Sequence, residues 1–204
     1  MTEPSKPIKS TDTLALLTRS LKDHLEAAQR LLESNLEQIM TAGELIRQTL
    51  HSGNKILICG NGGSAADAQH LAAELVGRFE RERRALPAFA LATNTSTLTA
   101  IGNDYSYEAV FARQLEGLSS PGDVAVAIST SGKSPNVINA VRTARKIGLV
   151  TVGMTGLRGD ELAAVVDYCI RVPSERTSRI QEAHILIGHI LCEIVDENFA
   201  PGRD

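Results

Sequence analysis

The amino-acid sequence predicts a three-layer α/β domain with a helical extension at its N-terminus. Short apolar runs recur from residue 55 onwards, and amphipathic stretches with helical spacing separate them. Strands that alternate with helices in this way pair into a parallel sheet with helices on both faces. Before residue 55 the apolar residues recur at helical spacing alone, which predicts two helices that extend the domain.

The elements are expected in the following order. Residues 1–10 contain two prolines and no apolar pattern, which indicates a disordered tail before a single domain at residues 11–204. Helical spacing runs from Asp12 to His51 with an interruption near Ser34, which predicts two helices. Strands are expected at 55–59, 88–92, 123–129, 149–154 and 167–172, and sheet-covering helices at 64–77, 107–118, 134–147, 160–165 and 178–199.

Composition limits the partners that the chain can have. The 204 residues carry a net charge of -3, whereas proteins that bind nucleic acid or membrane surfaces are usually basic. The sequence contains no apolar run of the roughly 18 residues that a membrane-spanning helix needs. The three cysteines lie in apolar surroundings without the spacing of a disulfide framework. We therefore expect a cytoplasmic protein with no nucleic-acid partner and no membrane partner.

The loop GNGGS at residues 60–64 follows the first expected strand and opens a helix. With Ala65 it matches the G-x-G-x-x-A fingerprint of dinucleotide-binding proteins. That fingerprint needs an acidic residue at the end of the second strand, but Glu80 and Glu82 precede this strand. A second loop of small and hydroxyl-bearing residues, at 129–134, is expected at the same crevice. Two such loops favour a compact sugar phosphate over a dinucleotide.

The loop STSGKS at residues 129–134 follows the third expected strand and precedes a helix. Free backbone N–H groups and the positive end of the helix dipole favour an anion there, most simply a phosphate. Ser134 as an ordinary helix cap is the simpler alternative. A nucleotide-binding P-loop is disfavoured, because its first glycine is replaced by Ala127. The hydroxyl groups of this loop belong to Ser129, Thr130, Ser131 and Ser134.

Two helices carry polar groups suited to proton transfer or metal binding. His70 and Glu74 are four residues apart, so their side chains lie on one helix face. An imidazole and a carboxylate at this separation can share a metal ion or a proton, although an exposed contact without function is the alternative. The last helix is apolar except where Gln181, His184 and His189 interrupt it. A single histidine of this kind is more often a structural residue than a ligand.

Taken together, long stretches of the chain resemble the phosphoheptose isomerases of the SIS (sugar isomerase) domain superfamily. The resemblance is carried by CGNGGSAADAQHLAAEL, AIGNDYSYEAVFARQ, ISTSGKSPNVI and RIQEAHILIGHILCEIVD. It implies a flavodoxin-like sheet of five parallel strands, a cytoplasmic homotetramer and one zinc ion per subunit. The implied reaction converts sedoheptulose 7-phosphate into D-glycero-D-manno-heptose 7-phosphate, which leads to the ADP-heptose of the lipopolysaccharide core.

The resemblance also assigns roles to individual residues. It implies His70, Glu74, Gln181 and His189 as zinc ligands. It implies substrate contacts from Asn61, Gly62, Gly63, Glu74, Asn103, Asp104, Ser129, Thr130, Ser131, Ser134 and Gln181. We interpret Glu74 as the base and His189 as the acid of the isomerisation, and His184 as structural. A residue bound tightly to zinc is a poor base, so three alternatives stay open for Glu74 and His189: they bind zinc, they act as base and acid, or they alternate between these roles. Lys133 is a departure, because the family has Asn at this position of the loop.

Two further expectations follow. The replication-initiator-associating proteins resemble the isomerases but lack Glu and His at the positions of Glu74 and His189, so an enzyme is favoured over a non-catalytic protein that binds sugar phosphate or the initiator. Gln181 and His189 are eight residues apart in one helix, a rise of about 12 Å. Because zinc holds its ligands at roughly 2.0–2.2 Å, we expect the site to be shared between subunits.

Overall fold

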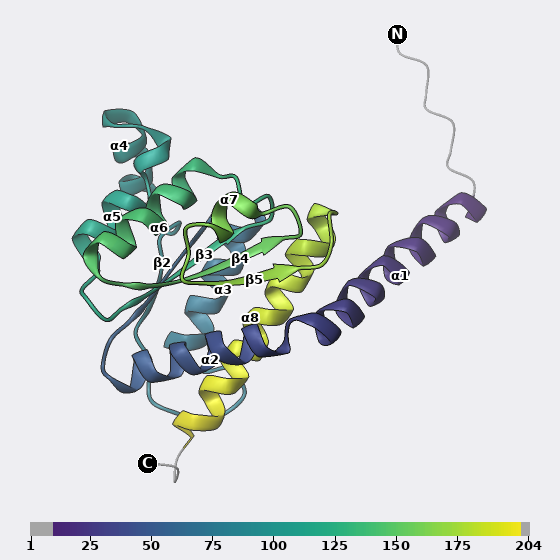
Figure 1. The fold of residues 1–204 in the computed structure, drawn as a ribbon, viewed down its shortest axis with the longest axis horizontal. Coiled ribbons are helices and arrows are strands. Elements are labelled where there is room, and N and C mark those ends of the chain that lie inside the picture. Colours follow the sequence, from purple (N-terminus) through teal and green to yellow (C-terminus); the bar gives the residue numbers. More distant parts are fainter. Residues whose placement is uncertain (1–9, 201–204) are drawn as a thin grey trace.

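The computed structural model describes residues 10–200, and five parallel strands form the centre of this part (Figure 1). The strands are β1 (Ile56–Gly60), β2 (Ala88–Ala90), β3 (Val124–Ser129), β4 (Val150–Gly156) and β5 (Tyr168–Val172). Their order in the sheet is β2-β1-β3-β4-β5. This is the flavodoxin-like order, so the predicted strands and the implied topology are confirmed.

Helices cover both faces of the sheet (Figure 1). One face carries α2 (Leu36–His51), α3 (Gly63–Val76) and α8 (Thr177–Phe199). The other carries α5 (Ala112–Leu118), α6 (Pro135–Ile147) and α7 (Asp160–Ala163), with α4 (Thr95–Asp104) and the short 3-10 helix η1 (Tyr107–Ala109) beside them. The predicted three-layer arrangement is therefore present.

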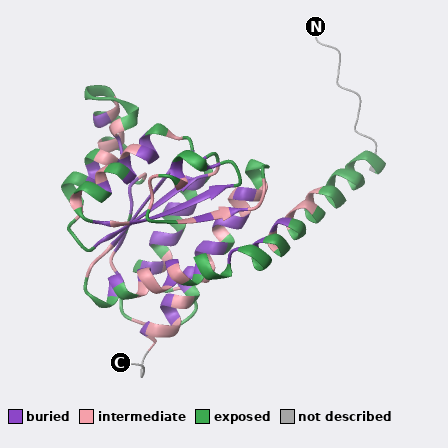
Figure 2. Cartoon of the chain, in the orientation of Figure 1, coloured by how far each residue is buried: buried purple, intermediate pink, exposed green. Residues whose placement is uncertain are grey.

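Alternation along the strands builds two apolar layers. Successive side chains of a strand point to opposite faces of the sheet. In β1, Ile58 joins the apolar cluster that contains Leu71 of α3 and Ile187 of α8. Its neighbour Leu57 joins the opposite cluster, with Val137 of α6. Strands β1 and β3 are buried throughout, as the purple arrows in Figure 2 show, which explains why they appear in the sequence as unbroken apolar runs.

The first helix, α1 (Ser10–Ser34), projects from the body of the molecule (Figures 1 and 2). Its later part packs through the buried side chains of Ala27 and Leu31, and His24 Nδ1 lies 2.7 Å from the Glu182 carboxylate of α8. Several of its leucines are exposed: Leu14, Leu17, Leu21, Leu25 and Leu32. The interruption predicted near Ser34 is confirmed, because α1 ends there.

Two segments differ from the sequence prediction. Helix α4 was not expected, because its Thr- and Ser-rich sequence has no apolar periodicity and Ile101 is its buried residue. Its N-terminus is instead fixed by Asn94, whose side chain accepts a hydrogen bond from the Thr97 N–H at 3.0 Å. The single helix expected at 107–118 is divided into η1 and α5. The tail expected at residues 1–10 lies outside the described residues except for Ser10, which begins α1.

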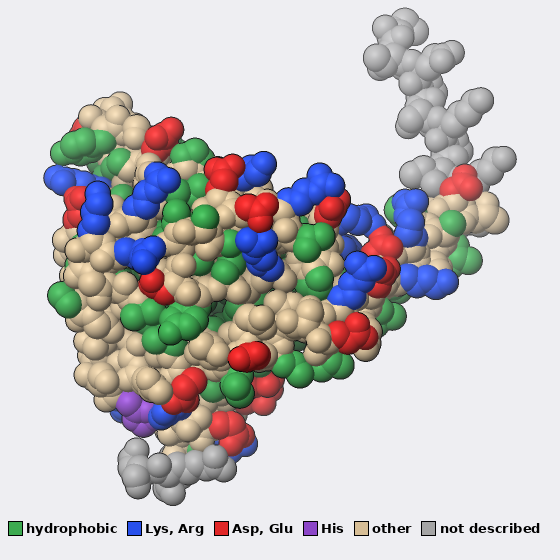
Figure 3. Space-filling model, viewed as in Figure 1, with side chains coloured by type: hydrophobic (Ala, Val, Ile, Leu, Met, Phe, Trp, Pro, Cys, Tyr) green, Lys and Arg blue, Asp and Glu red, His purple; other side chains and the backbone are tan. Residues whose placement is uncertain are grey.

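The surface mixes charges of both signs. In Figure 3, Lys and Arg side chains lie beside Asp and Glu side chains over much of the visible face. Within residues 10–200, no helix has the length and apolar character needed to cross a membrane.

Candidate active site

The GNGGS loop and the STSGKS loop lie at the carboxyl ends of the central strands β1 and β3. In an open parallel sheet the crevice between neighbouring strands whose connections leave in opposite directions is where ligands bind. The side-chain amides of Asn61 and Asn136 exchange two hydrogen bonds, each 2.9 Å long. The Tyr107 hydroxyl also donates to Asn61 Oδ1, at 3.1 Å. The loop after β1 is therefore fastened to the first turn of α6 and to η1. Asn136 and Tyr107 were not predicted as site residues.

The STSGKS loop after β3 folds around its own hydroxyl groups. Ser129 Oγ lies 3.0 Å from Ser134 Oγ and accepts a hydrogen bond from the Gly132 N–H at 3.2 Å. The Lys133 N–H donates to Ser131 Oγ at 3.2 Å. Although Ser134 precedes α6, its side chain makes no capping hydrogen bond within the described chain. This arrangement disfavours the interpretation of Ser134 as an ordinary cap and leaves its hydroxyl near the helix N-terminus.

Gly132 is required in this loop for two reasons. Its φ of +65° is in the left-handed region, where residues with a Cβ atom are disfavoured. A Cβ atom at this position would also lie 2.4 Å from the Cα atom of Gly159 and 2.8 Å from Oγ1 of Thr155. The loop can therefore pack closely against the segment that follows β4.

The GNGGS loop leads directly into α3 and meets α8. Gly62, with φ of +55°, precedes the helix. A Cβ atom at Gly63 would lie 3.4 Å from the Gln181 side chain, so α8 approaches the loop closely here. Gln181 Nε2 donates to Asp67 Oδ1 at 2.6 Å. The structure thus brings two of the predicted substrate contacts, Gly63 and Gln181, next to each other.

Asp67 is a polar residue of this region that the sequence prediction missed. Its side chain is buried, and Oδ2 has no hydrogen-bond partner among the described residues. Burial raises the pKa of this carboxyl group, although the hydrogen bond from Gln181 opposes the shift. Asp67 lies three residues before His70 and therefore on the same side of α3, which is the signal that could have identified it.

A second group of polar side chains lies where α3 packs against α8. His70 Nε2 is 2.9 Å from His189 Nε2, and Glu74 Oε1 is 3.5 Å from His70 Nε2. The side chains of His70 and Glu74 are 44% and 22% exposed, so a ligand can reach them. Gly188 permits the close approach of the helices, because a Cβ atom there would lie 2.5 Å from Leu71 Cδ2. Three predicted site residues from distant parts of the sequence are thus neighbours.

Other predicted residues are not brought into this group. Helix α8 is continuous, so Gln181 lies about two turns before His189 and contacts Asp67 instead. Asn103 and Asp104 end α4 and are exposed, and the Asn103 side chain donates to Asp104 Oδ1 at 2.8 Å. Among residues 10–200, no hydrogen bond or ion pair joins these two residues to either loop or to the histidines. The single chain therefore gathers part of the predicted set.

The zinc prediction concerns the histidine pair, Glu74 and Gln181. Within the described part of the chain, no group of three or more His, Cys, Asp or Glu side chains is arranged to hold a metal ion. The two imidazoles nevertheless point ring nitrogens at one another at 2.9 Å, beside a carboxylate. A tetrahedral zinc ion spaces two nitrogen ligands by roughly 3.3 Å. Imidazole nitrogens and a carboxylate are donor atoms that zinc prefers. To bind one zinc ion, the two imidazole nitrogens would have to lie slightly farther apart than the 2.9 Å in this structure.

Comparisons with known proteins place the chain in a family. The family model of the SIS domain matches residues 21–156. A phosphoheptose isomerase from a Nitratiruptor species is 52% identical, with 90% of this chain and 98% of the relative covered. One from a Roseiflexus species is 54% identical, with 88% and 93% covered. The solved phosphoheptose isomerase structure from Neisseria gonorrhoeae superimposes with a TM-score of 0.86 at 44% identity, covering 91% of this chain and 99% of that one. The chain belongs to the phosphoheptose isomerase family of SIS domain proteins.

Proposed function

We propose that this protein is a ketose–aldose isomerase that converts D-sedoheptulose 7-phosphate into D-glycero-D-manno-heptose 7-phosphate, the entry step to the ADP-heptose of the lipopolysaccharide core. The names of relatives more than half identical to this chain support the substrate. The observation that carries the proposal is that His70 contacts both Glu74, on the same helix that begins at the GNGGS loop, and His189 of α8. An isomerase needs a base and an acid, and this group contains candidates for both.

The reaction moves a proton between C1 and C2 of the sugar through an enediol. Glu74 takes the proton as general base, and His189 serves the carbonyl oxygen as general acid. The STSGKS loop holds the phosphate through its hydroxyl groups and the N-terminus of α6. Holding the phosphate fixes the sugar chain in position, which lowers the entropy that the reaction step must lose. Asn61, Gly62 and Gly63 hold the sugar, as do Asn103, Asp104 and Gln181.

Zinc is the proposed cofactor, one ion per subunit. His70, Glu74, Gln181 and His189 would hold it, and the bound ion would polarise the sugar carbonyl as a Lewis acid. A chelator should therefore lower turnover, and zinc should restore it more fully than magnesium, which prefers oxygen ligands.

The proposed assembly is a cytoplasmic homotetramer with sites shared between subunits. The exposed leucines of α1 support it, because apolar side chains in a row are buried when helices of two copies pack. The separation of Gln181 from His189 along α8 supports the sharing. A Gln181→Ala variant mixed with a Glu74→Gln variant should regain activity, because hybrid sites then combine intact residues from both chains. Mixtures that stay inactive after subunit exchange would contradict shared sites.

The deciding experiment incubates the purified protein with sedoheptulose 7-phosphate and follows the appearance of the aldose. Unphosphorylated sedoheptulose is the matched control, and its turnover should be far slower because the phosphate loop has nothing to hold. A non-catalytic protein that binds sugar phosphate or the replication initiator is the second candidate. It would bind the ketose, as calorimetry measures, without producing the aldose.

A further inference from the structure

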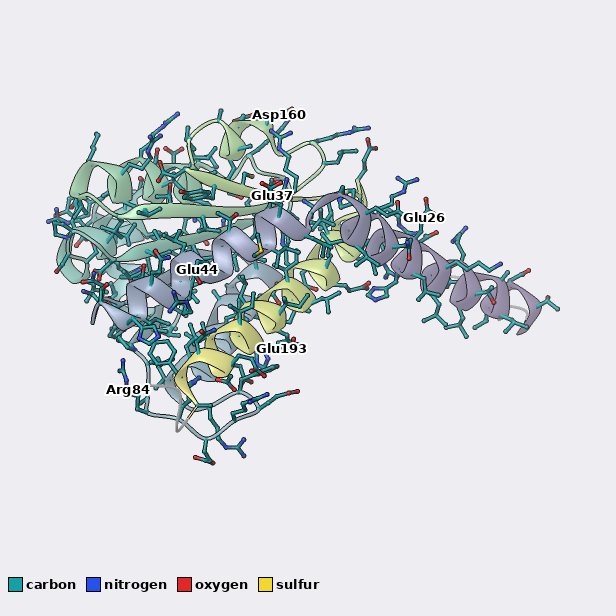
Figure 4. All side chains as sticks on the ribbon, turned by 60° about the horizontal axis from the view of Figure 1, so that its bottom comes forward. Glu26, Glu37, Glu44, Arg84, Asp160 and Glu193 are labelled. Carbon is teal, nitrogen blue, oxygen red and sulfur yellow. The ribbon has the colours of Figure 1, made fainter. Side chains whose placement is uncertain are left out.

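A buried ion pair joins the loop between α3 and β2 to helix α8. Arg83 Nε donates to Asp196 Oδ1 at 2.7 Å, and the two side chains are 0% and 2% exposed. The loop runs beside the C-terminal half of α8, as Figure 4 shows around the labelled Arg84. Removal of one partner of a buried charge pair is strongly destabilising, because the other charge is left buried and unpaired.

The same guanidinium group binds the end of α3. Its Nη2 donates to the Glu74 carbonyl at 2.7 Å, and Nη1 donates to the carbonyls of Leu75 at 2.9 Å and Gly77 at 3.3 Å. The last carbonyls of a helix have no partner inside the helix and favour a positive charge. Arg83 therefore caps the turn of α3 that carries Glu74, and one of its bonds goes to Glu74 itself.

Asp196 completes the connection from the side of α8. Its Oδ2 accepts hydrogen bonds from the backbone N–H groups of Glu80 at 2.8 Å and Arg81 at 2.9 Å. Burial opposes ionisation of this carboxyl group, but the Arg81 N–H, the Arg83 guanidinium and the Glu80 N–H outweigh burial and hold its pKa below the usual value. Asp196 lies seven residues, about two helical turns, after His189. One hydrogen-bonded unit thus links the backbone of Glu74 to the helix of His189.

We propose that Arg83 and Asp196 are positioning residues that set the separation between Glu74 and His70 on α3 and His189 on α8. The inference rests on the proposed function, because it assumes that this group performs the isomerisation. Arginine suits the task better than lysine, since its planar fork binds the carboxylate and four backbone carbonyls at once. Gly188 allows α3 and α8 to come into contact, and the ion pair holds the same two helices together at a second place.

The test compares Arg83→Lys with Arg81→Lys. Arg81 also joins this loop to α8, through Glu197, but as an ion pair on the surface with side chains 48% and 43% exposed. Both variants keep the positive charge and lose the fork. Asp196→Asn is the second variant at the buried pair, because it keeps the shape of the side chain and removes its charge. Kinetics and crystal structures of all three variants are compared with the wild type.

We expect Arg83→Lys and Asp196→Asn to lower kcat by about 10- to 100-fold, because small displacements of reacting groups have effects of this size. KM should stay within about twofold, since the phosphate loop lies elsewhere, and Arg81→Lys should match the wild type. The crystal structures should show a changed Nε2–Nε2 distance between His70 and His189 in the first two variants alone.

Two outcomes would overturn the proposal. One is an unchanged histidine separation in both buried-pair variants, which would leave Arg83 and Asp196 with a role in stability alone. The other is a changed separation with wild-type kcat. Inactivity of the wild type would instead refute the proposed function, and the crystallographic comparison would still decide whether the ion pair sets the separation.

Discussion

The STSGKS loop and the histidine pair are built in different ways. The loop forms from six consecutive residues, and its hydroxyl and N–H groups bond to one another within residues 129–134. The pair joins His70 and His189, which are 119 residues apart and meet because α3 packs against α8. The loop needs correct local turns, whereas the pair needs the whole helical layer. Changes in packing should therefore reach the chemistry of the pair before they reach phosphate binding.

The largest expected effect comes from the carboxylate beside the histidine pair. Glu74→Gln keeps the size of the side chain and removes the proposed base, so kcat should fall by at least about 100-fold. Steady-state kinetics with sedoheptulose 7-phosphate measures this, and binding of inorganic phosphate should be unchanged. Near-normal turnover would exclude Glu74 from the role of base.

The second prediction concerns His184, which lies on α8 between Gln181 and His189. Burial lowers its pKa to about 4, although the nearby Thr155 carbonyl opposes the shift, and neither ring nitrogen has a hydrogen-bond partner among the described residues. In the unfolded chain the His184 imidazole keeps its ordinary pKa of 6.5, so it binds a proton more readily there than in the folded protein. The stability that the folded protein gains from a neutral His184 is therefore complete above pH 6.5 and is lost as the pH falls toward 4. The free energy of unfolding should decrease by about 2 kcal/mol between pH 7 and pH 5 on this account.

Urea denaturation at several pH values measures this decrease. His184→Gln has no titrating group at the position and should show a flatter pH dependence than the wild type. An equal slope in both proteins would show that the buried histidine does not cause the acid sensitivity.

A smaller effect is expected at the loop. Ser131→Ala combined with Ser134→Ala removes two of the hydroxyl groups proposed to bind the phosphate, so KM for the sugar phosphate should rise by at least about 10-fold with the fold intact. Circular dichroism checks the fold. A change in kcat with KM untouched would mean that the loop does not hold the ground-state phosphate.

The smallest effect is expected from the exposed Lys133 in the same loop. Its charge adds a screened attraction to the phosphate, so Lys133→Asn should raise KM by about twofold. This difference should disappear at 1 M salt, where the Debye length is about 3 Å. A difference that persists in high salt would assign Lys133 a direct contact instead.

Sequence patterns predicted the elements that depend on local order. The five strands follow short, mainly apolar runs, and the STSGKS loop carries its hydroxyl groups close together in the sequence. Helix α4 was missed because a polar cap, and not apolar periodicity, fixes its start. Asn136, Arg83 and Asp67 were missed for another reason. Their partners lie 75, 113 and 114 residues away, so the local sequence does not indicate these contacts. For Asp67 the local sequence offers only its spacing from His70, which places both residues on one side of α3.

The position of α8 in the chain has a consequence for biosynthesis. This helix follows every strand, yet it supplies His189, Asp196 and the buried side chains Ile187 and Val195. While a ribosome makes the chain, the sheet can pair before α8 has emerged, and the part of one face that α8 covers then stays open to water. Such nascent chains expose apolar surface and are prone to aggregate. A chain that stops before residue 177 would therefore need a chaperone to remain dispersed.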